Sequence, residues 1–118
     1  MLIGRLAETG ETFRIKIDLP NKSERFALSF PVQLKQTSCA LTGQLDTADG
    51  HGIDRCEGAG SGKLVCNNGR KLSFRWALTS CMGGFGYTPN APKSHVIFGF
   101  GHNKDRALDQ LERAKSAT

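Results

Sequence analysis

The chain has 118 residues, which predicts a single domain, and its apolar fraction of 38% comes with fourteen glycines. Its net charge of +5 excludes an acidic solvating protein and falls short of the charge density of a dedicated DNA-binding protein. Apolar residues recur regularly, which excludes a disordered chain, and no window approaches the ~18 consecutive apolar residues of a membrane-spanning helix.

The first part of the chain has the alternation of β-strands. Residues 2–7 and 11–18 predict two short strands, the second alternating apolar and basic residues. Residues 26–34 alternate most strictly, and Pro31 on the opposite phase predicts an edge strand or a bulge. Residues 38–45 predict a further strand.

Residues 46–62 form the longest irregular stretch, and a loop of this length in a small domain is mobile or functional. Asp49 and His51 are the residues in it that we expect to contact a partner. The loop does not match the spacing of a calcium loop, and Gly58–Lys63 lacks the glycine and hydroxyl positions of a phosphate-binding loop. The sequence therefore indicates no metal and no cofactor.

Residues 63–66 and 71–76 predict a hairpin, because Asn68-Gly69 between two strand patterns is a strong turn signal. We expect Gly69 to adopt a positive φ. Leu72, Phe74 and Trp76 fall on one face of the second strand, and Lys71, Ser73 and Arg75 fall on the other.

The segment from Gly58 to Lys104 contains no acidic residue, although it carries six lysines and arginines. Cations without neighbouring carboxylates attract phosphate, sulfate or an acidic protein surface. Arg70, Lys71 and Arg75 are predicted to form an exposed cationic strip. Phe74 and Trp76 point to the core and so cannot stack on bases. We expect Phe85 and Tyr87, in a glycine-rich loop over residues 81–87, to be accessible to a ligand.

The end of the chain predicts a last strand at residues 96–100 and then a helix over about 104–115. Asn103 is the expected N-cap. The helix should dock on the sheet by an apolar stripe of Ala107, Leu108, Leu111 and Ala114.

The four cysteines are Cys39, Cys56, Cys66 and Cys81. An even number in a short, glycine-rich chain favours two disulfides and an oxidising compartment. A zinc site and four reduced core thiols are the alternatives, and the spacing does not match paired zinc ligands. We expect Cys66 to pair with Cys81 across the hairpin, and Cys39 with Cys56. If the disulfides form, the native chain had an export leader that precedes this sequence.

The spacing G-x-G-x-x-x-C-x-x-G-R from Gly60 to Arg70, followed by C-x-x-G-x-G from Cys81 to Gly86, resembles a pattern of small uncharacterised exported bacterial proteins. The resemblance covers a little over half the chain. It implies export and disulfides, and it assigns no activity and no functional residue.

Together these features predict an α+β fold, a curled antiparallel sheet of six or seven strands with one C-terminal helix. The expected function is that of a non-enzymatic binding module, periplasmic or secreted, that recognises a protein or an anionic polymer. The alternatives are an inhibitor or immunity-type protein, acting through the Asp46–Asp54 or Cys81–Tyr87 loop, and a nucleic-acid-binding domain. An enzyme is the least supported class, because the sequence shows no pairing of a nucleophile with a base.

Overall fold

A computed structural model describes residues 1–16, 27–34, 37–45, 59–80, 83–90 and 95–117. The strands are β1 (Leu2–Leu6), β2 (Thr12–Ile15), β3 (Ala27–Gln33), β4 (Ser38–Leu45), β5 (Ala59–Cys66), β6 (Lys71–Ser80), β7 (Gly83–Tyr87) and β8 (Val96–Phe100), and the helix is α2 (Lys104–Ala117). The helix is not long and apolar enough to cross a membrane.

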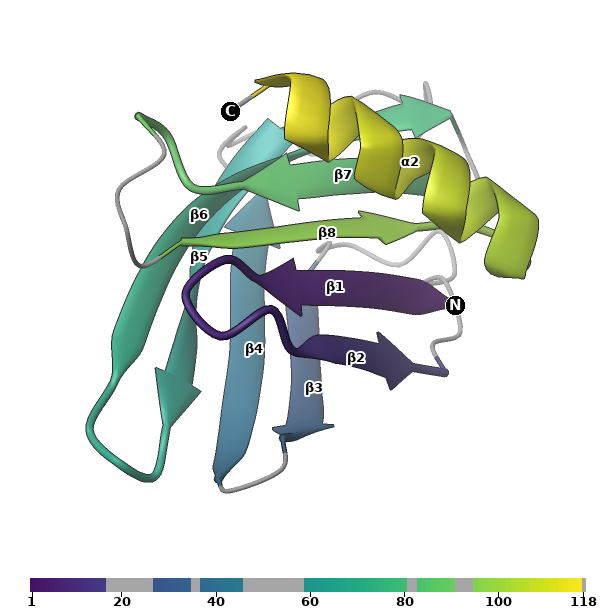
Figure 1. Ribbon diagram of the computed structural model, residues 1–118. Coiled ribbons are helices and arrows are strands. Elements are labelled where there is room, and N and C mark those ends of the chain that lie inside the picture. Colours follow the sequence, from purple (N-terminus) through teal and green to yellow (C-terminus); the bar gives the residue numbers. More distant parts are fainter. Residues whose placement is uncertain (17–26, 35–36, 46–58, 81–82, 91–94, 118) are drawn as a thin grey trace.

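All eight strands belong to one antiparallel sheet in the order β2-β1-β8-β7-β6-β5-β4-β3. The sheet curls until its two end strands, β2 and β3, approach each other, so that it forms a nearly closed barrel. In Figure 1 the strands β1, β2 and β8 cross in front of β3, β4 and β5, and α2 lies over β7 and β8.

The inside of the barrel holds the main hydrophobic core. Phe74 and Trp76 of β6 lie there with Phe98 and Phe100 of β8, and the Phe74 and Phe98 rings meet edge to face at 4.9 Å between centroids. A second, smaller cluster lies between the outer face of the sheet and the helix, and it joins Ile3 and Ile97 to Ala107, Leu111 and Ala114. In the described part of the chain, the sheet is therefore covered on both faces only where α2 packs.

The expected architecture is confirmed in outline, but among the described residues the sheet has eight strands rather than six or seven. The prediction of a loop over residues 81–87 is wrong, because β7 occupies Gly83–Tyr87 between β6 and β8. The strand β5 also begins at Ala59, inside the stretch expected to be irregular. Pro31 lies in the end strand β3, as an edge position requires.

Glycines stand in these strands because aromatic rings lie across them. Gly86 pairs with Phe98 and Gly84 with Phe100, and any side chain on either glycine would collide with the ring opposite. Gly62 has the same relation to Phe74. A Phe ring that covers a neighbouring glycine restores the packing that the glycine lacks.

The hairpin turn is confirmed. Gly69 has a φ of 89° and donates its N–H to the Cys66 carbonyl at 3.0 Å, and the Cys66 N–H donates to Arg70 O at 2.9 Å. Arg70 N–H also donates to the Asn68 Oδ1 at 3.0 Å. A turn followed by a glycine with positive φ is a common hairpin connection.

The helix begins as predicted, with the Asn103 Oδ1 accepting from the Arg106 N–H at 3.0 Å. Its buried stripe is narrower than expected, because Leu108 is 37% exposed while Ala107, Leu111 and Ala114 are buried.

The predicted disulfides Cys66–Cys81 and Cys39–Cys56 are wrong, because Cys39 is bonded to Cys66. These two residues face each other directly in the β4–β5 ladder. Expecting each cysteine to close a local loop overlooked that β4 and β5 are neighbours although residues 46–58 separate them. Cys56 and Cys81 lie outside the described residues.

Candidate cationic face of the hairpin

The candidate site lies on the outer face of the β5–β6 hairpin. Period-two alternation buries Leu72, Phe74 and Trp76 and leaves Lys71, Ser73 and Arg75 outside, as predicted. The inward side chains anchor β6 to the barrel core, so the outward ones are held on a supported strand rather than on a loop.

The pairing register brings a further cation to this face. Lys63 of β5 lies opposite Ser73, which is midway between Lys71 and Arg75 on β6. All three cationic side chains are exposed. The predicted strip did not include Lys63, because the predicted strand ends, Cys66 and Lys71, would place Lys63 opposite Phe74, one residue away from the observed register.

A shallow hollow lies beside these cations. It has a volume of about 510 Å³ and is lined by Thr42, Gly43, Ser61, Gly62, Lys63 and Ser73. Its hydroxyls offer hydrogen bonds to an oxygen-rich ligand. No Asp or Glu occurs in any strand from β3 to β8.

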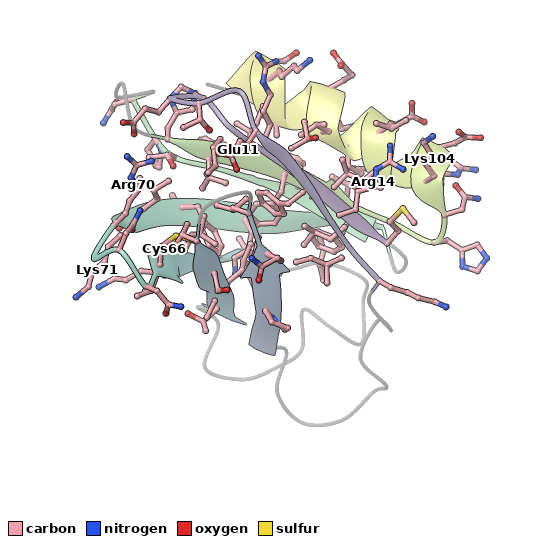
Figure 2. The ribbon with its side chains drawn as sticks, turned by 60° about the horizontal axis from the view of Figure 1, so that its bottom comes forward. Glu11, Arg14, Cys66, Arg70, Lys71 and Lys104 are labelled. Atoms are coloured by element: carbon pink, nitrogen blue, oxygen red, sulfur yellow. A yellow bond between two sulfur atoms is a disulfide. The ribbon has the colours of Figure 1, made fainter. Side chains whose placement is uncertain are left out.

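Arg70 lies at the end of the hairpin, between β5 and β6. Its Nη2 is 3.0 Å from the Glu8 Oε1, an ion pair that joins the hairpin end to the β1–β2 turn. The side chains are 33% and 40% exposed, so solvent screens the pair and its contribution to stability is small. Because Arg70 lies outside both strands, we define the cationic face by the outward strand residues Lys63, Lys71 and Arg75. Figure 2 shows Arg70 and Lys71 close together at one end of the molecule, away from Arg14 and Lys104.

Phe85 and Tyr87 are not loop residues. Both lie on β7, half-buried against the cluster under α2, with their rings stacked at 6.1 Å between centroids. The proposed use of residues 81–87 as an inhibitory loop is therefore wrong for Gly83–Tyr87, because a strand with a neighbour on each side cannot extend into a partner. Asp49, His51 and the rest of the Asp46–Asp54 loop lie outside the described residues.

The described part of the chain also bears on whether the protein could bind a metal ion. Within these residues there is no group of three or more His, Cys, Asp or Glu that could hold a metal ion. Comparisons with protein-family models, curated proteins and solved structures found no match.

Proposed function

We propose that this protein is a non-enzymatic binding module that engages an anionic polymer through the outer face of the β5–β6 hairpin. The observation that carries the proposal is the convergence of Lys63, Lys71 and Arg75 on one outward sheet surface, in strands that contain no carboxylate. The Cys39–Cys66 disulfide is compatible with an oxidising compartment. A periplasmic or secreted location is part of this proposal.

The spacing of the three cations favours a polymer over a small anion. Because Lys63 lies on the neighbouring strand opposite Ser73, its Cα is about 8 Å from those of Lys71 and Arg75. The ends of the row, Lys71 and Arg75, are roughly 13 Å apart along β6. Such a row matches anionic groups repeated along a chain.

The test is retention on immobilised heparin. The triple variant Lys63→Gln, Lys71→Gln, Arg75→Gln should lose most of the retention without a change in melting temperature, since these side chains are exposed. The matched control is Arg14→Gln, Lys16→Gln, Lys104→Gln, which removes the same charge from exposed positions elsewhere. It should keep most of the retention. Equal losses in both variants would show attraction by net charge alone.

The Arg70–Glu8 ion pair allows a second test of heparin binding. Glu8→Gln releases the Arg70 charge beside the cationic face, so this variant should elute from heparin at higher salt than the wild type. Arg70→Gln should have a smaller effect than Lys71→Gln because the Arg70 charge is already offset. If Glu8→Gln elutes at lower salt, the hairpin end is not part of the binding surface.

A further inference from the structure

A second cavity lies at the opposite end of β6, between the sheet and the helix. It has a volume of about 590 Å³, within the usual range for sites that bind small molecules. Phe100, Gly83 and Gly101 line it from the sheet side, and Arg106, Gln110 and Arg113 line it from α2. It shares no residue with the cationic face of the hairpin.

The polar lining is cationic. Arg106, Gln110 and Arg113 follow the i, i+4, i+7 spacing of one helix face, next to the buried stripe of Ala107, Leu111 and Ala114. Packing of that stripe on the sheet fixes the row at the cavity. His102 and Thr79 add a ring nitrogen and a hydroxyl, and no carboxylate is found among the described residues that line the cavity.

Docking of the helix is set by Gly99. A Cβ on Gly99 would collide with backbone atoms of Ala107, Gln110 and Leu111, so the helix lies directly against the strand there. This contact places Gln110 close to the sheet. Its Oε1 is buried and, among the described residues, has no hydrogen-bond partner. A buried acceptor without a donor costs about 1–3 kcal/mol. Because this oxygen has almost no accessible surface, the Gln110 side chain must turn toward the cavity before a ligand can donate a proton to it and recover that cost.

We propose that this cavity binds a phosphate monoester, with the phosphate between Arg106 and Arg113. Two arginines supply paired N–H donors for the anionic oxygens. The P–OH group of the monoanion, which predominates below the second pKa of a phosphate monoester at about 6, donates to the Gln110 Oε1. The rest of the cavity, floored by Phe100 and the backbone of Gly83 and Gly101, has room for the organic part of the ester.

The first experiment compares inorganic phosphate with sulfate at constant ionic strength near pH 6.5, followed by amide chemical shifts. Sulfate resembles phosphate in size and carries at least as much negative charge near pH 6.5, but it has no proton to donate to Gln110. We expect phosphate to shift Gly83, Gly101 and the Gln110 side chain, and to bind about tenfold more tightly than sulfate. Equal affinities, or shifts that are largest at Lys63 and Lys71, would overturn the proposal.

The second experiment uses matched variants. Arg106→Gln and Arg113→Gln should each weaken phosphate binding about tenfold or more, since each removes charge-assisted hydrogen bonds. Lys104→Gln with Lys115→Gln removes charge from the same helix outside the cavity and should leave the affinity unchanged. Unchanged binding in the arginine variants overturns the assignment.

The hairpin variant Lys63→Gln, Lys71→Gln, Arg75→Gln should bind phosphate normally. Loss of phosphate binding there would place the anion on the hairpin and refute the cavity site. The two proposed sites are thereby tested separately, and the wild-type shift map decides the location even if an arginine variant fails to fold.

Discussion

Gly69 shows how a single backbone conformation sets a turn. Its φ of 89° lies in the region that side chains with a Cβ disfavour, while the space around it is open. Gly69→Val should therefore lower the free energy of unfolding by about 1–2 kcal/mol through backbone strain alone. Gly69→Asn should lose less, because Asn tolerates this region better. Urea unfolding of both variants measures the difference, and a Gly69→Val protein as stable as the wild type would contradict the turn geometry.

Gly99 carries a different constraint, which is space rather than φ. A methyl group there would meet the backbone of α2, so Gly99→Ala should destabilise the protein by about 1–3 kcal/mol. Amide hydrogen exchange in the helix should accelerate more than exchange in β4 and β5. Ser73→Ala, at an exposed position of β6, is the control and should leave both unchanged. A uniform increase in exchange throughout the fold would show that Gly99 does not act through helix docking.

At the scale of elements, the helix, the hairpin and the alternating strands could be predicted from the sequence. Asn103, Gly69 and the period-two pattern of Leu72, Phe74 and Trp76 act over a few residues, so local signals are sufficient. Strand β7 could not be predicted in this way. Its glycines resemble a loop, and only the Phe98 and Phe100 rings lying across Gly86 and Gly84 explain why they form a strand.

The cationic face could be predicted in part for the same reason. Lys71 and Arg75 follow from the phase of one strand, whereas Lys63 depends on a register one residue away from the one that the predicted strand ends imply. The pairing of Arg70 with Glu8 joins residues 62 positions apart, and no local pattern indicates it. The cavity beside Arg106 and Arg113 depends on how α2 docks against Gly99, which is likewise a property of the tertiary structure.

The disulfide links two neighbouring strands, and this determines what a peptide map should show. Cys39 and Cys66 face each other in the β4–β5 ladder and are bonded to each other. We expect a Cys39–Cys66 peptide in a digest made without reductant. A Cys66–Cys81 peptide would contradict the pairing of β4 with β5.

Removal of this disulfide has a calculable effect on the unfolded chain. The bond spans a sequence separation of 27 residues, and the chain-entropy relation gives a stabilisation of about 3.5 kcal/mol. Cys39→Ser with Cys66→Ser should reduce the free energy of unfolding by roughly this amount. Chemical denaturation of the oxidised wild type and the double variant measures it, and a loss below about 1 kcal/mol would show that the unfolded state is already restricted.

At the scale of the whole molecule, the described aromatic side chains lie away from the cationic face. A face with cations and no rings suits any polyanion, whereas a nucleic-acid site also needs rings on which bases can stack. Phe74 and Trp76 are inside the barrel, and Phe85 and Tyr87 pack against each other and the cluster under α2. Among the described residues, few ring faces are therefore available for base stacking beside the cationic face. We expect single-stranded DNA and an abasic strand of equal length to bind with the same affinity, measured by fluorescence anisotropy. Clearly tighter binding of the strand with bases would favour a nucleic-acid-binding domain.

The salt dependence of that binding follows from the number of cations on the face. Release of counterions from a single strand gives a slope of log K against log salt of about −0.7 for each phosphate neutralised, so three cations predict a slope of about −2. Each single substitution of Lys63, Lys71 or Arg75 by Gln should make the slope shallower by about 0.7, whereas Lys104→Gln should leave it unchanged. A wild-type slope much steeper than about −2 would mean that cations elsewhere also contact the polymer. The binding surface would then extend beyond the β5–β6 hairpin.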